Sequence, residues 1–211
     1  MKNYYVQYGC GLSAPKEWIN FDVSPTLRIQ RIPLLGTIIR RYSNTKFPLN
    51  VRYGDIIKGL PVADNSCDGV YCSHTLEHLS LNDFRTALRN TFRILRKGGI
   101  FRCVVPDLEY YARHYIELVD AGDAAASIDF MRNTYLGSET RRRDITGLLI
   151  QHYGNAKHLW MWDRISFEME LKSVGFVDIR KCHFNDCSDS MFNAVEDSGR
   201  FENAVSFESR K

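Results

Sequence analysis

The sequence predicts an α/β fold in which a mostly parallel sheet of seven strands carries helices on both faces. Short apolar runs alternate with helical stretches over the first two thirds of the chain, and the runs end in Gly, Asp, Ser or Pro. The 211 residues are 44% hydrophobic and 25% charged, which is enough apolar material for a packed core. We expect a single domain over residues 1–211, with its core over 4–183 and a closing strand near 204–209.

The apolar runs and the helical periodicity assign most of the elements. The predicted strands are 4–8, 18–21, 50–53, 69–72 and 100–105, followed by 177–183 and 204–209 as closing strands. The predicted helices are 81–97, 109–121, 124–134 and 164–173. The helix at 81–97 has the clearest ends, because Ser80 can cap it and Gly98 can stop it.

Composition and charge also bear on location and partners. No apolar stretch follows a basic amino terminus, and nowhere do about 18 uncharged apolar residues run together, so we expect a cytoplasmic protein without a membrane span. The six cysteines are spread along the chain, which favours reduced thiols. The basic stretch 28–41 encloses the apolar run RIPLLGTII, which is either a surface for a membrane or an anionic acceptor, or a connecting segment packed on the domain. No nucleic-acid-binding motif occurs, so nucleic acid is disfavoured as a partner.

The residues that follow the predicted strands carry the chemistry. Ligands of open parallel sheets bind beyond the carboxyl ends of the strands. These ends supply Gly9 and Gly11, then Asp22, then Asp55, and finally Ser73 and His74. We expect them to converge on one rim of the sheet.

The turn that contains Gly9 and Gly11 has the spacing G-x-G-x-x-A of a dinucleotide fingerprint. Pro15 and the strand that starts near Trp18 leave no room for the helix that would hold a pyrophosphate. Asp22 follows Gly11 by 11 residues, whereas the ribose carboxylate of a dinucleotide fold follows after about 20. The turn therefore favours a nucleoside without phosphate, such as S-adenosyl-L-methionine (SAM), with a purely structural turn as the alternative.

Four stretches of the chain carry a resemblance to a known family. They are VQYGCG with WINFDVS, then YGDIIKGLPVADNSCDGVYCSHTLEHL, then FRILRKGGIFRCVVPD, and finally HLWMWDRISFEMELKSVGF. Together they resemble class I SAM-dependent methyltransferases of the type 11 group, and in particular small members with a shortened first motif. The resemblance implies a Rossmann-like methyltransferase fold with SAM as cofactor.

The resemblance also implies roles for the residues at the strand ends. Gly9 and Gly11 would line the methionine side of SAM, and Asp22 would bind the ribose. The adenine would lie at Asp55 and Ile56, and Ser73 would face the cofactor.

The methyl transfer itself is an in-line displacement that needs alignment, but a hydroxyl acceptor must also lose a proton. We expect His74 to serve as the base, with His158 as the second candidate; for each, a plain hydrogen bond to a loop is the alternative. Tyr153, Trp160 and Trp162 are candidates for a wall of the acceptor pocket or for ordinary core residues.

His74, Glu77 and His78 also match H-x-x-E-H, an inverted zinc-protease signature. This motif straddles a predicted strand end and stops at the Ser80 cap, so the helical spacing that zinc requires is not secured and we expect no metal there. The expected function is SAM-dependent methylation of an unidentified acceptor, with a small molecule or a glycan favoured. The alternatives are a catalytically inactive SAM-binding or scaffold protein of the same fold and, less favoured, a zinc hydrolase.

Overall fold

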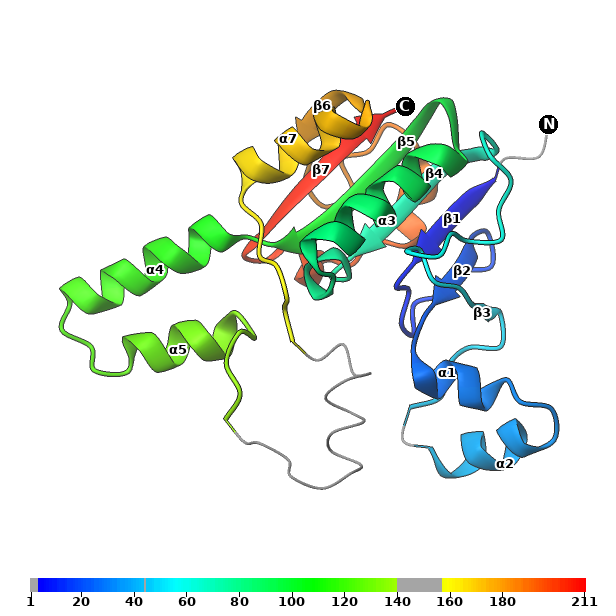
Figure 1. Ribbon diagram of the computed structural model, residues 1–211, viewed down its shortest axis with the longest axis horizontal. Helices are drawn as coiled ribbons and strands as arrows, with labels where there is room; N and C mark the ends of the chain where they lie inside the picture. Colours follow the sequence, from blue (N-terminus) through cyan, green and yellow to red (C-terminus); the bar gives the residue numbers. More distant parts are fainter. Residues whose placement is uncertain (1–3, 44, 140–156) are drawn as a thin grey trace.

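The computed structural model describes residues 4–43, 45–139 and 157–211, and its strands form one seven-stranded sheet (Figure 1). The strands are β1 (Tyr5–Tyr8), β2 (Ile19–Asp22), β3 (Val51–Tyr53), β4 (Cys67–Ser73), β5 (Leu95–Pro106), β6 (Val177–Lys181) and β7 (Ala204–Arg210). Their order in the sheet is β3-β2-β1-β4-β5-β7-β6. The first five strands are parallel, and β7 runs antiparallel to both β5 and β6. The mostly parallel seven-stranded sheet predicted from the sequence is confirmed.

The helices are α1 (Pro25–Gln30), α2 (Leu35–Tyr42), α3 (Leu81–Ile94), α4 (Leu108–Asp120), α5 (Ala126–Asn133) and α7 (Arg164–Val174), with short 3-10 helices η1 (Leu76–His78), η2 (Ser190–Ala194) and η3 (Ser198–Phe201). Ser80 caps α3 by accepting the N–H of Asp83, as predicted. The helix ends at Ile94, three residues before the predicted end, because Leu95 already pairs with Cys67 as the first residue of β5. Helices α1 and α2 were not predicted from the sequence, although Pro25 stands at a helix start, where a proline is well suited.

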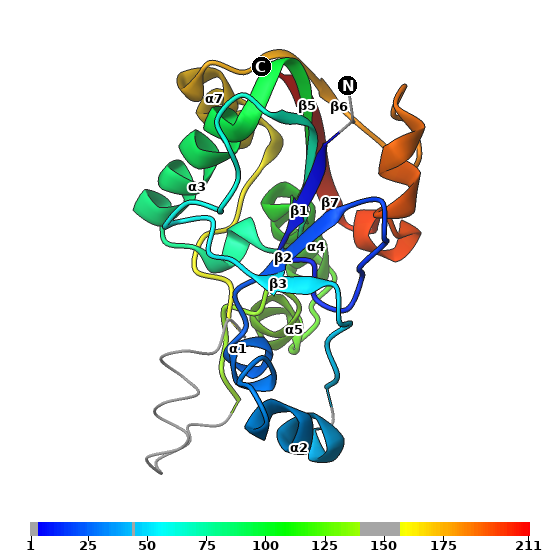
Figure 2. The ribbon, with the colours of Figure 1, turned by 90° about the vertical axis from the view of Figure 1, so that its right-hand side faces the viewer.

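The two faces of the sheet are covered differently. Alternate strand residues such as Val6, Val70 and Phe101 pack with α3 and α7 in the main core. Their neighbours in sequence, including Tyr5 and Tyr71, face the other side and pack against Phe192 and Val195 from the segment between β6 and β7. Figure 2 shows this segment, which contains η2 and η3, on the side of the sheet opposite α3 and α7.

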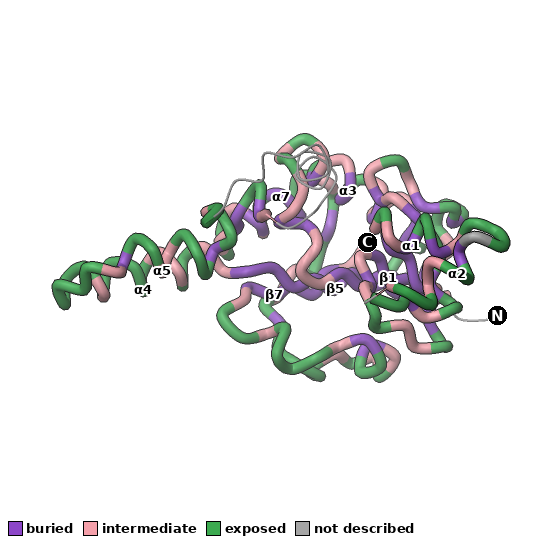
Figure 3. The backbone as a smooth tube through the Cα atoms, turned by 90° about the horizontal axis from the view of Figure 1, so that it is seen from below, coloured by how far each residue is buried: buried purple, intermediate pink, exposed green. Residues whose placement is uncertain are grey.

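Helices α4 and α5 project beyond the end of the sheet (Figure 3). Helix α4 follows β5 directly, begins at an Asp107 cap, and has no buried residue. Within the described part of the chain, no helix combines the length and the apolar character needed to cross a membrane.

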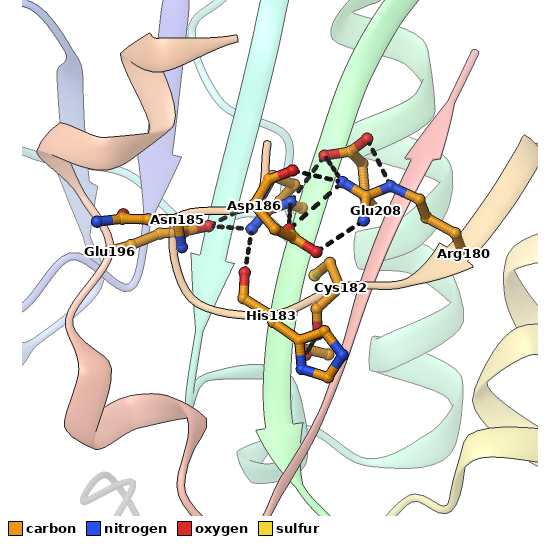
Figure 4. A network of polar contacts seen from close by, with 9 residues as sticks. Arg180, Cys182, His183, Asn185, Asp186, Glu196 and Glu208 are labelled. Atoms are coloured by element: carbon orange, nitrogen blue, oxygen red, sulfur yellow. Dashed lines mark hydrogen bonds and ion pairs between the residues drawn. The ribbon is translucent and has the colours of Figure 1, made fainter. Parts of the chain in front are cut away.

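A buried guanidinium ties the sheet to the segment that covers its second face. Arg102 of β5 is fully buried and donates hydrogen bonds to Asp186 (2.9 Å), Glu196 (2.7 Å) and Glu208 (2.7 Å). The three carboxylates converge at this point (Figure 4), and Arg180 of β6 pairs with Asp186 and Glu208 at its edge. A buried charge is tolerated only when it is paired and hydrogen-bonded in this way, so this cluster fixes how residues 183–201 lie on the sheet.

The Arg102 cluster makes folding stability depend on pH. Burial alone would raise the pKa of Asp186, but hydrogen bonds from Arg180 and Arg102 lower that pKa from 3.8 to about 2. Because the folded-state pKa is depressed, the carboxylate stabilises the fold above its unfolded pKa, and this contribution is lost as the pH falls toward the folded pKa. The whole contribution is about 2 kcal/mol.

We therefore expect Asp186→Asn to lower the free energy of urea unfolding at neutral pH, with the gap to the unaltered protein narrowing as the pH falls below about 4. Asp120→Asn, at the exposed end of α4, is the matched control and should leave stability unchanged at every pH. A gap for Asp186→Asn that stays constant from neutral pH down to about pH 3 contradicts the assignment.

Candidate cofactor and active site

The carboxyl ends of four neighbouring strands form the predicted rim. In parallel register, Tyr8 of β1 lies beside Phe21 of β2 and Cys72 of β4, so the residues that follow these strands are also neighbours. Beyond them, the N–H of Gly54 donates to the carbonyl of Asp22 at 3.1 Å and joins the ends of β2 and β3. The rim thus brings together Gly9, Gly11, Asp22, Asp55, Ser73 and His74, as the spacing of the strands predicted.

The two glycines of the turn differ in their surroundings. Both have positive φ, +64° at Gly9 and +54° at Gly11, a conformation that glycine adopts at no steric cost. A Cβ atom on Gly9 would lie 1.9 Å from Oγ1 of Thr75, so Thr75 occupies that side of the turn. A Cβ atom on Gly11 would meet nothing within 4 Å. The turn is therefore closed by the protein at Gly9 and open at Gly11.

Asp22 holds the open side of the turn in place. One of its carboxylate oxygens accepts the N–H of Gly11 at 2.9 Å, and the other accepts the N–H of Ser24 at 2.8 Å. The residue is only 9% exposed. Each carboxylate oxygen has a second lone pair, so the group can still accept hydrogen bonds from a ligand.

The loop between β1 and β2 contains no helix, as Pro15 and the early second strand predicted. Two buried side-chain amides hold this loop instead. Gln7 donates to Oδ1 of Asn20 (2.5 Å) and to the Ser13 carbonyl (2.9 Å). Asn20 donates to the carbonyls of Pro15 and Trp18. Neither Gln7 nor Asn20 was predicted as a functional residue from the sequence. The only available signal was the presence of two amide side chains within predicted strands, where buried polar groups need partners.

The remaining predicted cofactor residues lie just after β3 and at the end of β4. Asp55 accepts the N–H of Ile57 at 3.0 Å, and Ile56 is buried in the main core. Ser73 ends β4, and its hydroxyl oxygen is buried without a hydrogen-bond partner among the described residues. Their contacts with adenine and cofactor remain predictions.

Both predicted bases lie beside the carboxylate of Glu77. His74 has φ +47°, donates from Nε2 to the Arg200 carbonyl (2.8 Å), and places Nδ1 3.4 Å from Glu77 Oε1. Burial alone would lower the pKa of His74, but Glu77 and the Arg200 carbonyl outweigh burial and raise it. His158 is buried, with Nε2 3.9 Å from the same Glu77 oxygen, and burial lowers its pKa. Their role in proton removal stays a prediction.

The H-x-x-E-H motif does not have the helical geometry of a zinc protease. Only residues 76–78 form a 3-10 turn, and His74 lies outside it with its positive φ. His158, from a distant part of the chain, joins Glu77 and His78 instead, and one candidate ligand atom from each of these three residues lies within 4.8 Å of the other two.

The two tryptophans predicted for the wall of the acceptor pocket differ in their exposure. Trp162 is buried in the core with its ring centroid 4.1 Å from that of Phe84, so it supports the alternative of an ordinary core residue. Trp160 is 43% exposed. Tyr153 lies outside the described residues.

The difference between the two glycines predicts different costs of substitution. We expect Gly9→Ala to lower the free energy of urea unfolding by about 1–3 kcal/mol more than Gly11→Ala, because only the first adds a clash to the backbone strain that both share. Adding Thr75→Ala to Gly9→Ala should recover part of this extra loss. Equal losses for the two glycine substitutions contradict the contact with Thr75.

Comparison with known proteins agrees with this architecture. Residues 6–103 match the family model described as a methyltransferase domain. A SAM-dependent methyltransferase from Archaeoglobus fulgidus is 16% identical, with 99% of this chain and 86% of that chain covered at a TM-score of 0.51.

A second structure, a possible histamine N-methyltransferase from Thermotoga maritima, is 17% identical, with 100% of this chain and 83% of that chain covered at a TM-score of 0.50. These two structures share the fold, and no curated protein sequence matches the chain. Residues 6–103 therefore match a methyltransferase domain, and the chain has the fold of SAM-dependent methyltransferases.

Proposed function

We propose that this chain binds SAM at the corner formed by Gly11 and Asp22 and transfers its methyl group to a small-molecule or glycan acceptor. The observation that carries the proposal is the pairing of an open, side-chain-free turn with a buried carboxylate at the carboxyl end of the sheet. Class I methyltransferase domains use SAM, so the family match supports the same cofactor.

The polarity of the corner favours a nucleoside over a diphosphate. The Gly11 N–H, which could have bound a phosphate oxygen, is already donated to Asp22. The negative charge of the Asp22 carboxylate would repel a phosphate placed beside the Gly11 N–H. The remaining lone pairs of that carboxylate suit the hydroxyl groups of a ribose. Asp55 and Ile56, at the end of the adjacent strand β3, are the residues we assign to the adenine.

Transfer from SAM requires alignment of the acceptor with the methyl group, and the charge of the sulfonium disperses as the bond breaks. We assign the methionine side to Gly9 and Gly11, with Ser73 facing the cofactor. For removal of the acceptor proton we assign His74, since it stands at the end of β4 and its side chain is 26% exposed. His158 is the second candidate, although its buried ring faces Glu77.

The ribose assignment predicts the effect of Asp22→Asn, which keeps the size of the side chain and removes its charge. We expect the dissociation constant of S-adenosylhomocysteine, the demethylated product, to rise about 10- to 100-fold in calorimetry, because a hydrogen bond to a charged acceptor is weakened. Asp120→Asn is the matched control. Gly11→Ala should weaken binding as well, since its methyl group enters the open side. Unchanged affinity in both Asp22→Asn and Gly11→Ala would remove the basis of the proposal.

The activity itself is tested with SAM that carries a radioactive methyl group, offered with low-molecular-weight and glycan fractions of a cell extract. We expect label in one of these fractions, and expect His74→Asn to reduce the labelling while the affinity for S-adenosylhomocysteine stays unchanged. Binding of SAM with no labelled acceptor would instead support the alternative of an inactive SAM-binding or scaffold protein.

A further inference from the structure

Glu77 is a buried charged group at the rim. Its side chain is fully buried, and neither carboxylate oxygen has a hydrogen-bond partner in the part of the chain that the structure describes. A buried carboxylate normally accepts hydrogen bonds or binds a cation, because leaving it unpaired costs several kcal/mol. Apart from the ion pair with His74 at 3.4 Å, Glu77 thus has capacity to bind a cation.

His78 presents one ring nitrogen toward this carboxylate group. Its Nδ1 lies 2.9 Å from the carbonyl oxygen of Lys157. A carbonyl can only accept, so Nδ1 carries the proton and the neutral ring keeps its lone pair on Nε2. Metal-binding histidines are oriented by this kind of bond from their second nitrogen.

His158 also lies beside Glu77, and its ring has a further hydrogen bond with the backbone of Thr134. Its Nδ1 lies 3.3 Å from the sulfur of Met161, a weak acceptor, and its Nε2 lies 3.9 Å from Oε1 of Glu77. The rings of His78 and His158 meet edge to face, with centroids 5.0 Å apart. Each histidine thus has a hydrogen-bonding neighbour at Nδ1 and one ring nitrogen within 4.8 Å of a Glu77 oxygen.

We propose that Glu77, His78 and His158 bind a divalent cation of the zinc type. A ligand atom from each of the three residues lies within 4.8 Å of the other two, so small side-chain rotations would bring all of them into coordination range. Two imidazole nitrogens and one carboxylate are a donor set that zinc accepts, and this set leaves a fourth position for water or another oxygen ligand. The site differs from the H-x-x-E-H trio of the sequence, because His158 takes the place of His74.

The backbone holds the two halves of the site together before any cation binds. The N–H groups of Leu159 and Trp160 both donate to the main-chain carbonyl of Glu77, at 2.7 Å and 3.1 Å. His158 is thereby fixed beside residues that precede it by about 80 positions in the sequence. His74, whose Nδ1 is 3.4 Å from the same Glu77 oxygen, is placed to orient the carboxylate.

The test uses the full chain, stripped with a chelator and titrated with Zn²⁺ against a competing chromophoric chelator. We expect one ion per chain, and expect Glu77→Gln and His158→Ala each to raise the dissociation constant at least about 100-fold. His114→Ala, which removes an exposed histidine of α4, is the matched control and should bind like the unaltered chain. Cobalt substituted for zinc should give visible d–d absorption without the charge-transfer band of a thiolate ligand.

Several results would overturn the proposal: no stoichiometric binding by the unaltered chain, undiminished binding by Glu77→Gln, or a thiolate band that places the ion on cysteine. Circular dichroism of each variant shows whether the fold persists, and Zn²⁺ should raise the melting temperature of the unaltered chain but not that of Glu77→Gln. Calorimetry with S-adenosylhomocysteine is carried out separately on the same variants. Its result tests the cofactor proposal, so failure of either proposal leaves the other standing.

Discussion

The buried guanidinium of Arg102 is the constraint on which the arrangement of the second sheet face depends. Once this charge lies inside the sheet it must be neutralised, and its three carboxylate partners all come from residues 186–208. The segment between β6 and β7 is therefore held against the sheet by charge as well as by the apolar contacts of Phe192. This segment ends near the rim, where the Arg200 carbonyl accepts the hydrogen bond of His74.

The rim is consequently built from both ends of the chain. The glycine turn and Asp22 come from the first 22 residues, within the part that matches the methyltransferase family model. The groups around His74 and Glu77 come from elsewhere. His158, in the segment before α7, lies beside Glu77, and Arg200 of η3 lies beside His74. A chain truncated after β5 would keep the turn and Asp22 but would lose both Arg200, which positions His74, and His158.

The sequence was sufficient for features that depend on local patterns. Apolar runs located every strand, and the glycines and carboxylates after them located the rim, because parallel strands end on the same edge. Contacts between distant residues could not be predicted in this way. Nothing local to Gly9 indicates that Thr75 lies against it, and nothing near Glu77 indicates His158. Helices α1 and α2 were missed because their mixed basic and apolar residues fit a surface segment as well as a helix.

One short segment, residues 73–78, serves both parts of the rim. Thr75 donates to the carbonyl of Ser73 at 3.1 Å while its side chain fills the space beside Gly9, so the segment is packed against the turn. Two residues later, Glu77 faces His158, and its carbonyl anchors the chain before Trp162. Because this one segment contacts the glycine turn through Thr75 and carries Glu77 and His78, a displacement at one part of the rim must be accommodated at the other. The positive φ at His74 is the bend that lets the chain turn from β4 toward both.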